Sequence, residues 1–204
     1  MSVELEFDKL ADEMKTLEEA EVRKASELSF TKEQMANHLR GPDHVNAIIK
    51  GHLYFEHVLI TAIQDALEYP DEVNVRQLSF PAKLNLATAL GQLPKEMKTA
   101  GSILNDLRNK IAHRIDFEFT SEDRDRLWYA LPESLRDTVL DFKQVAKDQH
   151  HVVTIHHILV AFLMTAETYR VGRAKDRARS RVAQVHIGRA VKLAAPGMKA
   201  RGLI

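Results

Sequence analysis

The residues best suited to chemistry lie in one predicted helix near the middle of the chain, in the stretch RNKIAH. Arg108, Asn109 and His113 occur there within six consecutive positions. An arginine offers a fixed charge and a planar fork of donors that suits a phosphodiester. A histidine titrates near neutral pH, so it can move a proton to or from a ribose oxygen. If their side chains converge, these residues would together support RNA cleavage without a metal, with the ribose 2′-hydroxyl as nucleophile and a 2′,3′-cyclic phosphate as product.

Helix geometry pairs only two of these three side chains. Asn109 and His113 are four residues apart and therefore share one helix face. Arg108 and His113 are five residues apart, roughly 140° around an ideal helix, so the arginine must bend to reach the same groove. Arginine and histidine occur at this spacing by chance in many proteins. A solvated helix edge with one structural histidine is therefore the alternative interpretation.

Other positions hold candidate metal ligands, but none forms a complete set. His52 and Glu56 are one helical turn apart, Asp43 and His44 begin a predicted helix, and histidine doublets occur at 150–151 and 156–157. A closed site needs three or four ligands that converge, and the spacing does not bring such a set together. No glycine-rich phosphate loop, H-E-x-x-H motif or nucleophile elbow is present. The sequence predicts neither a metal nor an organic cofactor.

The elements that must position these residues are helices. The 204 residues include only 8 glycines and 6 prolines, and apolar residues recur with a helical period along most of the chain. A capping box is predicted at Thr31 with Gln34, and the stretch Thr120-Ser121-Glu122-Asp123 is predicted to cap a further helix. The broadest apolar face belongs to the segment 43–68, which is therefore the predicted central core helix. The predicted fold class is all-α, an up-and-down helical bundle with extra N-terminal and C-terminal helices.

The predicted organisation has three parts, and their charges differ. They are an acidic N-terminal helical extension (1–39), a helical bundle (40–148) and a C-terminal helix with a basic tail (149–204). The formal net charge is zero, yet residues 1–36 hold ten acidic and five basic side chains, and residues 170–204 hold ten basic and one acidic. Such a basic segment can bind nucleic-acid phosphates or pair with an acidic surface, including this chain's own N-terminal segment.

Composition narrows the cellular setting. The chain has no cysteine, which excludes disulfides and thiol catalysis. Apolar residues make up 45% of the sequence, but no run reaches the roughly 18 residues that a membrane-spanning helix needs. We expect a cytoplasmic protein that has no membrane partner.

Three segments in a fixed order resemble the HEPN superfamily. They are the core helix DHVNAIIKGHLYFEHVLITAI, the segment LSFPAKLNLATALGQL and the helix LNDLRNKIAH. The hallmark of that superfamily is an arginine, usually followed by a polar residue, with a histidine four to six residues further on. The resemblance covers roughly residues 40–148 and is closest to the mannitol-repressor-like branch.

The resemblance implies a helical domain that dimerises through its motif helices. In catalytic members, two copies of the motif form one cleft that acts as a metal-independent endoribonuclease. Arg108 would bind the scissile phosphate, His113 would transfer the proton, Asn109 would take the polar role between them, and Glu56 on the core helix would support the site. RNA and a second copy of the chain are then the expected partners. A toxin or antiphage role, with an antitoxin or regulatory protein as a further partner, fits the same class.

Two other classes of function compete with the nuclease. The mannitol-repressor-like branch contains regulators and scaffolds, so a non-catalytic regulator or protein-interaction module is the first alternative. The second is an oligomer-forming structural protein that uses its oppositely charged terminal helices as arms. Exposed charge pairing of that kind would weaken at high salt.

Overall fold

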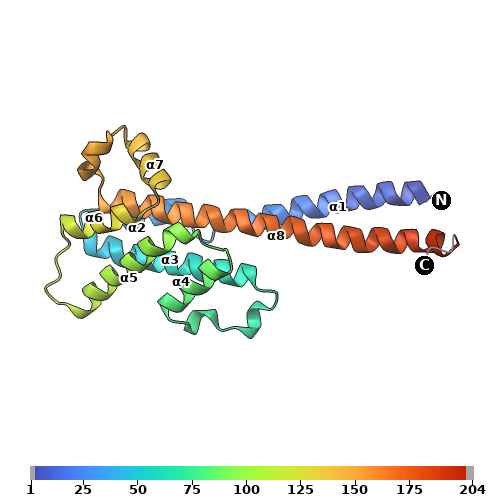
Figure 1. Cartoon of the computed structure of the whole chain (residues 1–204), viewed down its shortest axis with the longest axis horizontal. Helices are drawn as coiled ribbons and strands as arrows, with labels where there is room; N and C mark the ends of the chain where they lie inside the picture. The colour runs from blue at the N-terminus through green and yellow to red at the C-terminus, as the bar shows by residue number, and fades with distance from the viewer. Residues whose placement is uncertain (1–2, 201–204) are drawn as a thin grey trace. The chain divides into compact units, whose positions relative to one another are not determined.

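The described part of the protein is entirely helical. The computed structural model describes the backbone of residues 3–200 and the side chains of residues 6–195, and this range contains no strand (Figure 1). The α-helices are α1 (Val3–Ala25), α2 (Lys32–Leu39), α3 (His44–Ala66), α4 (Phe80–Ala89), α5 (Lys98–His113), α6 (Ser121–Ala130), α7 (Glu133–Lys143) and α8 (Ile155–Ala200). The 3₁₀ helices are η1 (Pro70–Glu72), η2 (Val75–Gln77), η3 (Lys95–Met97) and η4 (Lys147–Val152). The all-α prediction is confirmed. Within the described residues, no helix is long and apolar enough to cross a bilayer.

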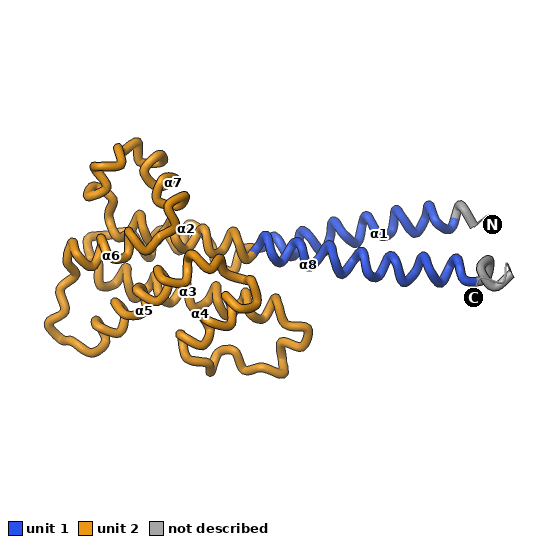
Figure 2. Tube along the Cα trace, in the orientation of Figure 1, with its two compact units in different colours: residues 1–27, 171–204 blue, residues 28–170 orange. Residues whose placement is uncertain are grey.

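The chain forms two compact units (Figure 2). One consists of residues 28–170, and the other of residues 1–27 together with 171–204. The predicted bundle, 40–148, lies within the first unit. Helix α2 also belongs to that unit because Met35 and Leu39 are buried in its core. Helix α8 contributes its first part to the larger unit and the rest to the smaller one.

Helix α3 is the core helix of the larger unit, as its broad apolar face predicts. It packs against α2, α4 and α5. Ile48, Phe55 and Ile63 on α3 have no measurable exposure to solvent. The ring of Phe55 lies 4.6 Å, centroid to centroid, from the ring of Phe162 on α8. Helices from distant parts of the sequence therefore share one apolar core.

The helix starts follow the predicted signals with one exception. The Asp43 side chain accepts a hydrogen bond from the backbone N–H of Asn46, and Thr120 forms a capping box with Asp123. The capping box predicted at Thr31 is wrong, because the Thr31 side chain makes no capping hydrogen bond. The backbone carbonyl of Thr31 accepts the N–H of Met35 instead, and burial of Met35 holds this helix start in place.

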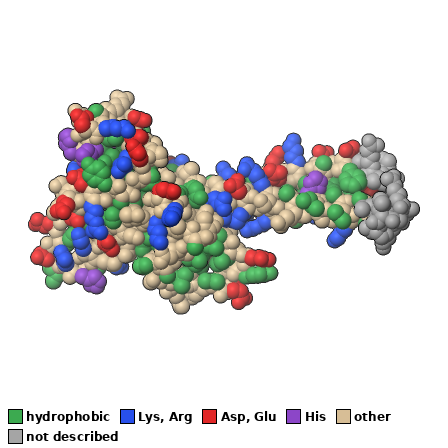
Figure 3. All heavy atoms as spheres, in the orientation of Figure 1, with side chains coloured by type: hydrophobic (Ala, Val, Ile, Leu, Met, Phe, Trp, Pro, Cys, Tyr) green, Lys and Arg blue, Asp and Glu red, His purple; other side chains and the backbone are tan. Residues whose placement is uncertain are grey.

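The smaller unit pairs α1 with the second part of α8. Leu10 and Met14 of α1 pack against Val182 of α8 in a small apolar core. Ion pairs follow the charge asymmetry of the sequence, with Arg179 at 3.8 Å from Glu18 and Arg189 at 3.6 Å from Glu13. Figure 3 shows acidic and basic side chains interspersed along this pair of helices. Part of the basic C-terminal segment thus pairs with the acidic N-terminal segment, one of the two alternatives that the charge pattern leaves open.

Candidate functional site

Helix α5 carries the RNKIAH motif and is fixed in the larger unit by one apolar stripe. Leu104 and Leu107 are fully buried, and Ile111 packs against the same core from a partly buried position. Ala112, which the helical period places near this stripe, is exposed. The opposite face of the helix is left to the solvent.

A glycine brings α5 close to the core helix. A Cβ atom added to Gly101 would lie only 2.7 Å from Cε1 of Phe55 on α3. Such a distance is well inside van der Waals contact, so a larger residue would require the Phe55 ring or the helix to shift. The α3–α5 contact thereby sets the position of the whole motif helix.

The three motif side chains lie at the surface at the C-terminal end of α5. Arg108 and His113 are exposed, and Asn109 is half-buried. The Arg108 guanidinium donates to the Asn109 Oδ1 at 3.2 Å. Neither Arg108 nor the following Arg114 has a carboxylate partner within the described part of the chain. The end of α5 therefore presents two cations and one imidazole that are open to a solvent-borne anion.

A buried polar pair lies directly behind the motif. His52 on α3 is 5% exposed, and its Nε2 lies 3.2 Å from the Asn105 Oδ1 on α5. Since a side-chain carbonyl only accepts, the imidazole donates from Nε2. Burial lowers the pKa of His52, an effect that the hydrogen bond to Asn105 opposes only in part. His52 is thus neutral at neutral pH and holds α5 against α3.

Glu56, the fourth residue of the predicted site, is bound by a lysine from α4. The Lys83 Nζ lies 2.8 Å from the Glu56 Oε1 and also donates to the backbone carbonyl of Arg76 at 3.0 Å. The Lys83 side chain is only 3% exposed, whereas that of Glu56 is 26% exposed. A buried ammonium of this kind needs its counter-charge, so the Glu56 carboxylate has a structural task in addition to any role near the motif.

The charges of Arg108, Lys83 and Glu56 all act on the pKa of His52. The charges of Arg108 and Lys83 act to lower its pKa, and the charge of Glu56 acts to raise it. Arg108 on α5 and Glu56 on α3 are thus both close enough for their charges to act on His52. Among the described residues, no hydrogen bond or ion pair joins His113 to this neighbourhood around His52, so the polar contacts within one chain include the arginine but not the histidine of the motif.

Sequence reasoning missed two members of this neighbourhood, Asn105 and Lys83. Asn105 stands three residues before Arg108, which places both on one face of α5. His52 stands one turn before Glu56 on α3, and that spacing by itself indicates only a weak metal pair. The position of Lys83 had no comparable signal, because a lysine in an apolar segment gives no indication of a buried partner.

One histidine of each doublet, His150 and His157, has a local partner. The His150 Nε2 lies 3.1 Å from the hydroxyl of Tyr129, and the His157 Nδ1 accepts the backbone N–H of Thr154 at 3.2 Å. The described residues contain no group of three or more His, Cys, Asp or Glu side chains that could hold a metal ion. Within the described residues, the candidate metal pairs are therefore not joined by a third ligand of these types.

Comparison with known proteins adds no relative. No family model matches the chain, and no match is found among curated proteins or among solved structures. The functional interpretation therefore depends on the site residues themselves.

Proposed function

We propose that this protein is a metal-independent endoribonuclease of the HEPN type. The observation that carries the proposal is the state of Arg108. Its guanidinium is exposed, is oriented by Asn109 and has no carboxylate partner among the described residues. An arginine in that state can bind a phosphate through two parallel hydrogen bonds. The exposed His113 lies at the end of the same helix.

The reaction follows from these two residue types. One imidazole takes the proton of a ribose 2′-hydroxyl, and the oxygen attacks the adjacent phosphorus atom. The bond from phosphorus to the 5′-oxygen breaks, and a second imidazole, in its protonated form, gives its proton to that oxygen. The products are a 2′,3′-cyclic phosphate and a 5′-hydroxyl. Arg108 stabilises the negative charge that grows on the phosphate oxygens in the transition state.

Two imidazoles require two copies of the chain. Each chain supplies one motif histidine, and Arg108 and His113 are about 140° apart around the axis of α5. A pair of α5 helices related by twofold symmetry would place an arginine and a histidine from each chain in one cleft. The homodimer is therefore part of the proposal, with RNA as the substrate class. A toxin or antiphage role, controlled by a partner protein, is the corresponding biological class.

Purified full-length protein and a structured RNA test the proposal. We expect cleavage by the wild type, with a loss of at least a hundredfold in Arg108→Ala and in His113→Ala, because general acid–base steps contribute about 10²–10⁴-fold. Arg181→Ala and His151→Ala are matched controls at other exposed positions and should cleave as the wild type does. Equal cleavage by all five proteins would assign the activity to something other than the motif.

One observation favours the non-catalytic alternative, a regulator or protein-interaction module. Ile115, two residues beyond His113, is fully exposed, and Leu53 on α3 is 52% exposed. A partner protein that covered Ile115 would remove its apolar surface from water, which favours binding. A wild-type protein that leaves RNA intact and binds a protein partner through Ile115 would support this alternative.

A further inference from the structure

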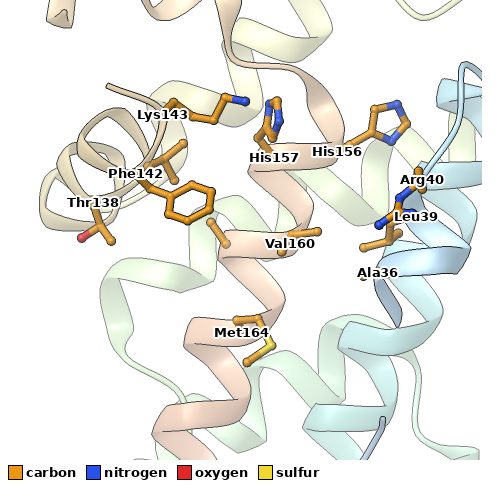
Figure 4. Close-up of a pocket in the computed structure, with 12 residues that line it drawn as sticks. Ala36, Leu39, Arg40, Thr138, Phe142, Lys143, His156, His157, Val160 and Met164 are labelled. Carbon is orange, nitrogen blue, oxygen red and sulfur yellow. The ribbon is translucent and has the colours of Figure 1, made fainter. Parts of the chain in front are cut away.

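A concave site lies in the larger unit, between α2, α7 and α8, and its interior is largely apolar (Figure 4). It encloses about 460 Å³. Phe142 from α7, Ala36 from α2, and Val160 and Met164 from α8 line its apolar part. Its volume lies in the range of roughly 300–1,000 Å³ that is typical of small-molecule sites. No residue of this pocket belongs to the α5 site.

One end of the pocket carries positive charge. Arg40 follows α2 and Lys143 ends α7, and both line the pocket. Neither cation has an ion-pair partner in the described part of the protein, and no Asp or Glu lines the pocket. In Figure 4, Lys143 and Arg40 lie toward the end occupied by the two histidines, and Met164 lies toward the opposite end. The pocket is thus polar and cationic at one end and apolar at the other.

His156 and His157, at this end, each have at least one ring nitrogen that is available for a hydrogen bond to a ligand. The His157 Nδ1 accepts the backbone N–H of Thr154, so the proton of the neutral ring is on Nε2, which can donate to a ligand. Burial, helped by Lys143 and His156, lowers the pKa of His157. Both ring nitrogens of His156 are buried and have no hydrogen-bond partner among the described residues. Such orphaned polar atoms are uncommon in proteins.

We propose that this pocket binds an amphipathic carboxylate, such as a medium-chain fatty acid. Lys143 and His157, which lie next to one another in Figure 4, would bind the carboxylate, and Arg40, which lies beyond His156, would add positive charge from the other side. The hydrocarbon chain would lie along Val160 and Met164. Two cations without counter-charge beside an apolar cavity suit an anionic head group on an apolar body. A neutral apolar ligand would leave the cations unused, and a cationic amphiphile would be repelled.

Calorimetric titration of the full-length protein with decanoate tests this proposal, with decanol and decyltrimethylammonium as ligands of matched chain length. We expect decanoate to bind with one-to-one stoichiometry and at least tenfold more tightly than either of the others. Arg40→Met and Lys143→Met should each weaken decanoate about fivefold to tenfold. Lys147→Met, at an exposed lysine paired with Asp137, is the matched control and should leave binding unchanged.

Three results would overturn the proposal. Decanol binding as tightly as decanoate would show that the cations make no contribution. If Lys147→Met weakened decanoate binding as much as Lys143→Met, the weakening would come from the general charge of the surface and not from the pocket. No binding of decanoate to the wild type would exclude this ligand class without involving any variant, so the proposal stays testable even if a substitution disturbs folding.

Discussion

His52 on α3 and Asn105 on α5 lie 3.2 Å apart, Nε2 to Oδ1, and this hydrogen bond joins the core helix to the helix that carries Arg108. Asn105 is three residues before Arg108 on the same helix face. The ring of Phe80 lies 4.4 Å from the His52 ring, centroid to centroid, and closes the site from α4. The motif is therefore fixed from behind by a buried, neutral imidazole.

The burial of His52 predicts a pH dependence of stability. Its pKa is lowered in the folded protein, so below about pH 6.5 the unfolded chain binds a proton that the folded chain does not. The free energy of unfolding should be highest above that pH and should fall as the pH is lowered toward the folded-state pKa. Urea unfolding between about pH 8 and pH 5 measures this effect.

His52→Gln is the matched variant, because glutamine keeps a donor for Asn105 but does not titrate. We expect its stability to fall less with decreasing pH than that of the wild type. His157, whose pKa is also lowered by burial, should give the variant a remaining slope of the same sign. Identical slopes in the two proteins would mean that the folded environment does not act on the ionisation of His52.

The pair between Lys83 and Glu56 predicts a large coupling. Its nitrogen and oxygen are 2.8 Å apart, and the lysine is almost fully buried. A double-mutant cycle with Lys83→Met and Glu56→Gln should give a coupling free energy of about 1–3 kcal/mol. The exposed pair of Arg126 and Asp106 is the control and should give less than about 1 kcal/mol. Equal couplings would show that burial adds nothing to the first pair.

Replacing Gly101 with alanine should change the stability of the protein in the opposite direction from the same replacement at Gly188. In Gly101→Ala the new methyl group meets Phe55 at 2.7 Å, and we expect a loss of about 1–3 kcal/mol from overpacking. Gly188 is in helix α8, and a Cβ atom added there would meet no other atom within 4 Å. Gly188→Ala should stabilise the protein by up to about 1 kcal/mol, because alanine favours the helix. Chemical unfolding of both variants measures the difference, and destabilisation of both alike would contradict the packing argument.

The absence of cysteine allows a direct test of the proposed dimer. The wild type contains none, so Asn109→Cys carries a single thiol at the motif. If two α5 helices face one another, oxidation should convert most of this variant into a disulfide-linked dimer. His151→Cys places a thiol at an exposed position in η4 and should remain a monomer under the same oxidation. Equal cross-linking of both variants would indicate random collisions, and no cross-linking at position 109 would contradict a shared cleft.

The helical architecture follows from the sequence because its signals are local. The apolar period, together with the caps at Asp43 and Thr120, depends on residues a few positions apart. The start of α2 after Thr31, without a side-chain cap, shows the limit of such signals. There, a backbone hydrogen bond from Met35 to the Thr31 carbonyl and the burial of Met35 stabilise the helix start in place of a side-chain cap.

The surroundings of the site depend on contacts between distant segments, which local patterns do not encode. Lys83 and Glu56 are 27 residues apart, and His52 and Asn105 are 53 residues apart. The sequence around one partner does not show which residue it pairs with, because the two residues meet only when α3, α4 and α5 pack together. The sequence therefore predicts Arg108, Asn109 and His113, which share one helix, but not the groups that hold this helix in position.

Attack of the ribose 2′-hydroxyl leaves characteristic product ends, and these ends distinguish the proposed reaction from hydrolysis by a metal-activated water. Wild-type protein and RNA are incubated with EDTA, and the ends of the fragments are determined by mass spectrometry. We predict 2′,3′-cyclic phosphates and 5′-hydroxyls with the wild type, and intact RNA with His113→Ala. Fragments with 5′-phosphates, or cleavage that EDTA abolishes, would show that the motif does not act through the ribose 2′-hydroxyl.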